Sequence, residues 1–310
     1  MSRESRKKRL TPEEKELWAA TQEGIPIERV RAYLQLAEIE QDQYKFKDAA
    51  AIYEVAIEIL EAESEIDYAP EQAQALYEMA GCLSLSYEFE QELEVIKKAL
   101  DFAEKSGFGD VPSLLRAAGR SLHALNDDEN SIKYHQRAYE YPNPDISEEE
   151  LAIDQLNIGM SLKKLERYQE AIEKIQFARE SFKKLKEPKW VAICDGELTE
   201  IYIGLNDGVS VEKYALLALG TAEMIEDRYR QWWLQYYLGI AKRLQGDLDS
   251  SLEHLENGRS LALAFGCDEF KYLVKVDLEI AGIYVIKGMV KQAEEIERRA
   301  RNVESILEAA

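Results

Sequence analysis

The sequence predicts an all-α fold, a right-handed superhelical solenoid built from antiparallel helical hairpins. Three observations support this prediction. A unit of helix, polar turn and second helix recurs along the chain. Only 7 of the 310 residues are proline and 16 are glycine. Residue patterns typical of helix N-termini occur where the recurring unit predicts that helices begin. Hydrophobic residues make up 46% of the chain and charged residues 32%, which excludes a disordered chain.

The repeat is marked by one small residue in the first helix of each hairpin. After this residue come a polar turn, such as Gly246-Asp247-Leu248, and a second helix led by a small residue, such as Ala171 or Ser251. About seven hairpins are expected, the first at about 30–62 and the last at about 270–308. Successive small residues are 38 to 44 positions apart, and three of the six steps are 40; the residues are Ala37, Gly81, Gly119, Gly159, Thr199, Gly239 and Ala281.

This unit resembles the tetratricopeptide repeat, whose consensus has the same small-residue spacing on two packed helices. The long step resembles the extended arrays of the LGN/Pins proteins, rapsyn and kinesin light chain, over about residues 30–305. The resemblance implies that the first helices line a concave groove, in which an extended peptide or a partner's helix commonly lies.

Two helix starts are marked by capping boxes, in which a hydroxyl and a glutamate three residues later satisfy free backbone N–H groups. These are Thr11 with Glu14 and Ser147 with Glu150. Residues 1–10 are expected to form a basic disordered tail, and 11–310 a single solenoid. The break at 141–145 is too short to be a flexible linker between domains.

The net charge of −21 predicts a surface that repels nucleic acid and anionic membranes. No apolar stretch is long enough to span a bilayer, so a cytoplasmic protein is expected. The basic run Arg6, Lys7, Lys8 and Arg9 leaves nuclear import open. Exposed apolar faces at the ends of the array leave a homo-oligomer open as well.

No pattern in the sequence indicates an enzyme, a metal site or a cofactor. The three histidines show no metal-ligand spacing, and Cys82, Cys194 and Cys267 lie far apart. Gly107-Phe108-Gly109 lacks the lysine of a phosphate-binding loop and is expected to be a turn between repeats. The cysteines are expected to be structural.

The candidate site is the predicted groove, read from first-helix residues that share a face with the small packing residues. Basic residues there would hold the carboxylates of an acidic peptide, and Trp233 with Tyr236 would hold its apolar anchor. Glu200 and Lys275 make the groove mixed in charge. The alternative is that the basic residues pair with neighbouring glutamates on the same helices and the aromatic residues belong to the core. The candidate residues are Arg116, Arg120, His123, Asn157, Met160, Lys163, Lys164, Trp233, Tyr236 and Arg243.

The sequence therefore predicts a scaffold or adaptor that binds a protein or peptide partner. A regulatory protein that senses a peptide is the alternative, and an enzyme is the least favoured interpretation. Trp232, unlike Trp233, is expected to be a packing residue.

Overall fold

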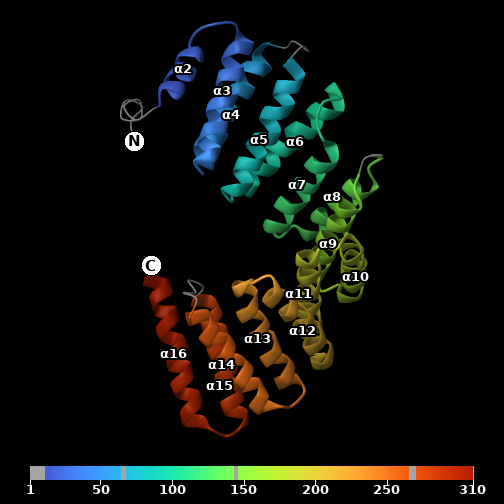
Figure 1. The fold of residues 1–310 in the computed structure, drawn as a ribbon, viewed down its shortest axis with the longest axis vertical. Helices are drawn as coiled ribbons and strands as arrows, with labels where there is room; N and C mark the ends of the chain where they lie inside the picture. The colour runs from blue at the N-terminus through green and yellow to red at the C-terminus, as the bar shows by residue number, and fades with distance from the viewer. Residues whose placement is uncertain (1–10, 64–67, 143–145, 265–269, 310) are drawn as a thin grey trace. The chain divides into compact units, whose positions relative to one another are not determined.

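The computed structural model describes residues 11–63, 68–142, 146–264 and 270–309, which form helices and turns and no strand (Figure 1). The predicted all-α fold of helical hairpins is confirmed. The expected basic tail, with Arg6, Lys7, Lys8 and Arg9, lies outside the described residues. The chain divides into two compact units, Met1–Asp145 (unit 1) and Ile146–Ala310 (unit 2).

Unit 1 holds helix α2 (Pro12–Ala20) followed by hairpins. Each helix packs on the next along the chain, and the first helices α3 and α5 also contact each other. A continuous core runs through the unit, with Tyr53, Ile96 and Leu115 almost fully buried. The hairpins are α3 (Pro26–Asp42) with α4 (Phe46–Glu63), α5 (Ala69–Leu85) with α6 (Phe89–Ser106), and α7 (Val111–Ala124) with α8 (Asp128–Glu140).

Unit 2 is built in the same way. Its first helices contact one another in order, α9 with α11 and α11 with α13, so they form a common layer. The hairpins are α9 (Glu148–Lys164) with α10 (Tyr168–Leu185), α11 (Pro188–Gly204) with α12 (Gly208–Met224), α13 (Arg228–Leu244) with α14 (Leu248–Ala264), and α15 (Phe270–Ile286) with α16 (Val290–Ala309).

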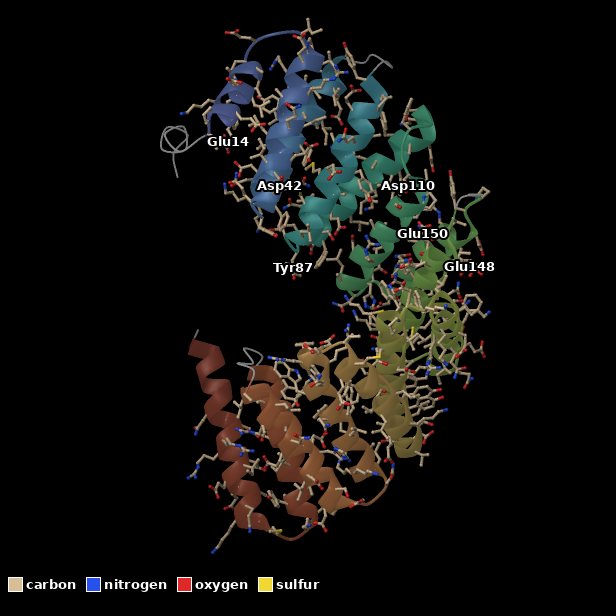
Figure 2. All side chains as sticks on the ribbon, viewed as in Figure 1. Glu14, Asp42, Tyr87, Asp110, Glu148 and Glu150 are labelled. Carbon is tan, nitrogen blue, oxygen red and sulfur yellow. The ribbon has the colours of Figure 1, made fainter. Side chains whose placement is uncertain are left out.

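Both predicted capping boxes are confirmed. The Glu14 backbone N–H donates to Thr11 Oγ1 (3.1 Å), and the Thr11 N–H donates to Glu14 Oε2 (2.5 Å). At the start of α9, the Glu150 N–H donates to Ser147 Oγ (3.2 Å) and the Ser147 N–H donates to Glu150 Oε2 (3.0 Å). Figure 2 marks Glu148 and Glu150 in this first turn, where negative charge complements the helix dipole.

Every hairpin turns through one residue in the left-handed region, with φ between 56° and 84°. The next residue donates its backbone N–H to the carbonyl five residues earlier, as Arg167 does to Leu162 (3.0 Å). This is the Schellman pattern that ends a helix. Only the last two hairpins use glycine there, so the turns are hard to recognise in the sequence. The turn residues are Tyr44, Tyr87, Asn126, Glu166, Asn206, Gly246 and Gly288.

Small residues allow close helix packing at most of the predicted positions. A Cβ added at Gly159 would lie 2.4 Å from Ile175 Cγ1, and one at Gly239 would lie 2.6 Å from Leu255 Cγ. The alignment is wrong at Gly81, which is exposed and would meet no atom within 4 Å. Its neighbour Ala80 is buried instead, because a shift of one residue turns a side chain by about 100° around the helix.

Candidate functional site

The predicted site residues divide between the two units. Arg116, Arg120 and His123 lie on α7 of unit 1. The other seven lie on two first helices of unit 2: Asn157, Met160, Lys163 and Lys164 on α9, and Trp233, Tyr236 and Arg243 on α13.

The α7 residues do not form the expected carboxylate clamp. Arg116 is only 5% exposed, so the prediction that it faces an open groove is wrong. It occupies one of the buried positions of α7. Arg120 is exposed and near enough to Glu92 to act on its charge. His123 Nδ1 lies 2.5 Å from Asp128 Oδ1 and is held within the α7–α8 hairpin.

On α9, Lys163 is committed to internal ion pairs. Its ammonium lies 2.7 Å from Glu197 Oε2 and also contacts the Glu200 carboxylate, both on α11. Burial acts to lower the pKa of Lys163, but the two carboxylates raise it above its ordinary value. Lys163 is therefore paired internally, as in the alternative, but with glutamates of a neighbouring helix and not of its own. Lys164 is exposed, and Asn157 and Met160 are partly buried.

The α13 residues combine packing with partial exposure. Trp232 is buried and stacks on Tyr272, which confirms its role in packing. Trp233 is half-buried, meets Tyr272 edge to face at 4.8 Å between ring centroids, and contacts Tyr236 in the same way at 5.9 Å.

Burial beside Glu279 raises the pKa of Tyr236 to about 12, so its hydroxyl stays protonated near neutral pH. Arg243 Nε lies 3.0 Å from Glu279 Oε2, which ties the end of α13 to α15. Arg243, like Lys163, is therefore paired across neighbouring first helices.

A pocket of about 390 Å³ opens among these first helices. We call it the α11–α13 pocket. Its lining includes the apolar side chains of Ile193 and Leu234 and the aromatic ring of Trp233. The lining residues are Ala192, Ile193, Gly196, Glu197 and Glu200 from α11, Ala218 from α12, Tyr229, Arg230, Trp233, Leu234 and Tyr237 from α13, and Lys275 from α15.

The two carboxylates of this pocket share one lysine, so one negative charge remains between them. Tyr237 Oη donates to Glu200 Oε1 (2.5 Å), and Lys163 pairs with both glutamates. Burial acts to raise the pKa of Glu200, but Lys163 and this hydrogen bond hold it below its ordinary value. The same burial and the adjacent Glu200 carboxylate raise the pKa of Tyr237.

Lys275 is the exposed cation at this pocket, and its charge also helps to lower the pKa of Glu200. Its ammonium lies 5.5 Å from the centroid of the Trp233 ring. It makes no ion pair with any described residue, and its side chain is exposed. Arg230 is less available, because its guanidinium pairs with Asp227, the N-cap of α13. A ligand carboxylate next to an apolar anchor in this pocket would therefore bind Lys275 in preference to Arg230.

Of the predicted residues, Trp233 lines the pocket. Lys163 does not line it but pairs with two carboxylates that do, those of Glu197 and Glu200. The choice of site residues missed Glu197, Tyr229, Arg230 and Tyr237. Three of these, Tyr229, Arg230 and Tyr237, stand three or four residues from Trp233 and so share its helical face. That spacing was the signal in the sequence that could have found them.

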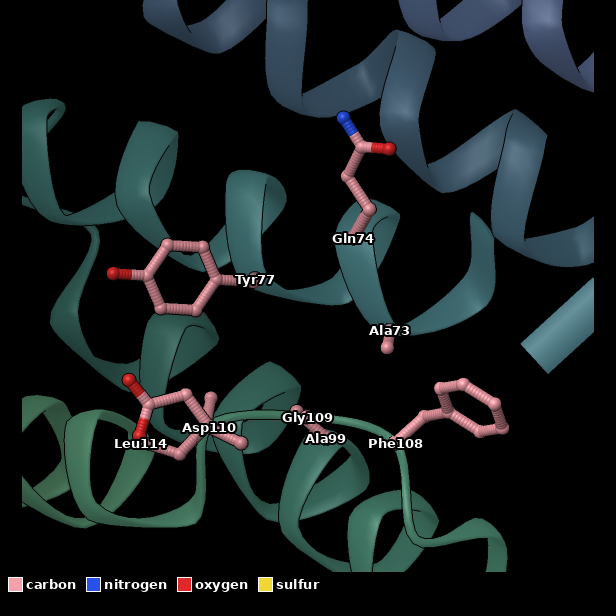
Figure 3. Close-up of a pocket in the computed structure, with 8 residues that line it drawn as sticks. All are labelled: Ala73, Gln74, Tyr77, Ala99, Phe108, Gly109, Asp110 and Leu114. Carbon is pink, nitrogen blue, oxygen red and sulfur yellow. The ribbon is translucent and has the colours of Figure 1, made fainter. Parts of the chain in front are cut away.

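Unit 1 has a smaller pocket of about 330 Å³ at the turn between α6 and α7 (Figure 3). The exposed rings of Tyr77 and Phe108 border it. Gly107, with φ of 75°, ends α6 here and donates its N–H to Ala103 O, so the predicted turn is confirmed. No basic side chain lines this pocket, and none of the predicted residues belongs to it; the lining residues are Ala73, Gln74, Tyr77, Ala99, Phe108, Gly109, Asp110 and Leu114.

The thiols described are poorly suited to nucleophilic chemistry. Cys82 and Cys194 are buried and free. Burial raises the pKa of both and brings that of Cys194 to about 12, so their thiolates are disfavoured. Cys267 lies outside the described residues. In the described part of the chain, no cluster of three or more His, Cys, Asp or Glu could hold a metal ion, and no helix is long and apolar enough to cross a membrane.

No protein-family model matches the chain, and no curated protein matches it in sequence. Solved structures do match. The apo form of RapI has a TM-score of 0.67 and 16% identity, covering 91% of this chain and 99% of RapI. The signal transduction ATPase PH0952 of Pyrococcus horikoshii, with its tetratricopeptide repeat sensor, has a TM-score of 0.70 and 15% identity; the match covers 96% of this chain and 45% of that protein.

The fold is tetratricopeptide-like. The apo form of the quorum sensor NprR from B. thuringiensis agrees, with a TM-score of 0.61 and 14% identity, covering 94% of this chain and 92% of NprR. At these identities the likeness establishes the tetratricopeptide-like fold and leaves function to the residues of the site.

Proposed function

We propose that this tetratricopeptide-like protein is an interaction protein that binds a peptide segment or a partner's helix on the first helices of unit 2. The observation that carries the proposal is the α11–α13 pocket. It joins apolar side chains and the Trp233 ring to the exposed ammonium of Lys275. Such a pocket fits an apolar anchor residue next to a carboxylate.

The partner segment that we propose is acidic, as the sequence predicted, but it is held by Lys275 and not by the predicted basic cluster. Arg116 is buried and Lys163 is neutralised by Glu197 and Glu200, so neither offers a free charge to a ligand. The proposal describes a binding protein and not an enzyme. The step of about 40 residues between successive repeats of the chain also supports the resemblance to the long-repeat arrays of LGN/Pins proteins, rapsyn and kinesin light chain.

Peptide sensing is a second candidate, and the structural neighbours favour it. NprR is a quorum sensor, and the array of PH0952 is described as a sensor. An adaptor and a sensor would use the same pocket. They differ in whether binding changes the protein's conformation, which small-angle X-ray scattering with and without a bound peptide would distinguish.

Gly196 offers a direct test of the pocket. It lies on α11 in the pocket wall, and an added Cβ would meet no atom within 4 Å. Gly196→Leu should therefore fill the pocket without disturbing the fold. We expect it to weaken the binding of peptides selected from a random displayed library by about tenfold or more, measured by fluorescence anisotropy.

Gly81→Leu is the matched control, because Gly81 is also in a helix with open space around it but belongs to unit 1. It should leave the affinity unchanged. Lys275→Glu should weaken acidic peptides selectively, whereas Lys291→Glu, at an exposed lysine on α16, should not. Failure to select any peptide, or equal binding by Gly196→Leu, would contradict the proposal.

A further inference from the structure

The outer face of α12 is apolar where the equivalent faces of its neighbours are polar. Val209, Leu216, Leu217 and Met224 are 44% to 71% exposed. Gly220 lies among them, and an added Cβ there would meet no atom within 4 Å. Successive positions among 209, 216, 220 and 224 are seven, four and four residues apart, so they form one stripe along the helix.

The neighbouring second helices show that this stripe is a local property of α12. Helices α10, α12 and α14 begin at residues 168, 208 and 248, so equivalent positions differ by 40. Six of the eight residues that correspond to the four apolar residues of α12 are polar or charged. They are Gln169, Gln176, Phe177 and Lys184 on α10, and Asp249, Glu256, Asn257 and Ala264 on α14.

Two unpaired charges of opposite sign flank the stripe. Lys213 is exposed, and its ammonium lies 4.9 Å from the centroid of the Tyr214 ring. Glu223 is exposed as well. Among the described residues neither makes an ion pair. They stand five residues before and five residues after Ala218, so the level of Ala218 lies midway between the two charges.

We propose that this face pairs with the same face of a second copy of the chain, with the two α12 helices antiparallel and a twofold axis at the level of Ala218. This arrangement brings Lys213 of each copy to the level of Glu223 of the other, which gives two ion pairs. It also brings Leu216 to the level of Gly220, where the missing side chain leaves room. A twofold contact of this kind uses the same patch on both copies.

The opposite charges favour a second copy over an unrelated partner. A patch that carries one positive and one negative charge at equal distances from its centre is complementary to itself when turned by 180°. A helix of 17 residues is about 25 Å long, so the contact is small. The dimer should therefore be weak, with a Kd on the order of micromolar or higher.

Sedimentation velocity of the full chain over a concentration series tests the proposal. We expect a monomer–dimer equilibrium that Leu216→Glu abolishes. Gln176→Glu, at the equivalent position on α10, is the matched control and should leave the dimer intact. Circular dichroism of each variant checks that the helices are retained.

Charge reversal makes the test specific for the antiparallel arrangement. Lys213→Glu alone and Glu223→Lys alone should each weaken the dimer several-fold, and the double variant should restore it. A monomer at every concentration, a dimer unaffected by Leu216→Glu, or a double variant as weak as the single ones would overturn the proposal.

Discussion

Gly159 and Gly196 both lie within first helices of unit 2, yet their surroundings differ. A Cβ at Gly159 would come within 2.4 Å of Ile175 Cγ1 on the second helix of the same hairpin. At Gly196 the space is open, because the residue borders the α11–α13 pocket. One glycine permits close packing of helices, and the other leaves room for a ligand.

Alanine substitution should separate these two roles. Glycine within a helix costs about 1 kcal/mol relative to alanine, so Gly196→Ala should raise the free energy of unfolding by about that amount. Gly159→Ala should lower it by about 1–2 kcal/mol, because overpacking against Ile175 outweighs the gain in helix propensity. Urea denaturation measures both. Equal stabilisation by the two substitutions would show that the packing at Gly159 is not close.

Buried ion pairs hold consecutive hairpins of unit 2 together. Asp195 on α11 receives two hydrogen bonds from Arg179 on α10 (2.5 and 3.2 Å). Asp277 on α15 accepts from Arg259 on α14 (2.8 Å) and from Arg299 on α16 (2.8 Å). Both aspartates are almost fully buried. Each pair crosses from one helix to the next, so it fixes how those helices stack.

Asp277→Ala should destabilise unit 2 by about 3 kcal/mol. It would leave two arginine side chains, Arg259 and Arg299, without the carboxylate that compensates them. Asp249→Ala is the control: Asp249 pairs with Lys287 across the same hairpins but is 88% exposed, so its loss should cost less than about 1 kcal/mol. Chemical denaturation of both variants gives the comparison, and similar losses would contradict the role assigned to burial.

Features set by nearby residues could be predicted from the sequence, and features set by stacking could not. Ser147 and Glu150 are three residues apart, so their capping box was visible. Lys163 and Glu197 are 34 residues apart, and only the packing of α9 on α11 shows that they pair. The burial of Arg116 on α7 likewise depends on how the helices of unit 1 pack, which the sequence alone does not show.

The aromatic part of the site was partly predictable for a related reason. Trp233 follows from the hairpin alignment, because α13 begins 40 residues after α11 and keeps the register of the repeat. The alignment does not show which aromatic residues leave space beside them. Gly196 and Ala192 create that space from the neighbouring helix α11.

At the scale of the whole molecule the net charge is −21, and the two carboxylates of the binding face both pair with Lys163. The account therefore assigns the two faces of unit 2 different tasks. The first helices bind an acidic segment beside Lys275, and the outer face of α12 pairs with a second copy. These two assignments depend on different residues and can fail independently.

The most direct test of the central claim is photo-crosslinking with a selected peptide that carries a photoreactive leucine at its anchor position. The intact chain is irradiated with the peptide, digested and read by mass spectrometry. The account predicts crosslinks in 188–204 and 228–244, the helices α11 and α13 that form the pocket, and their loss in Gly196→Leu. Crosslinks confined to α10 or α14, or to unit 1, would contradict it.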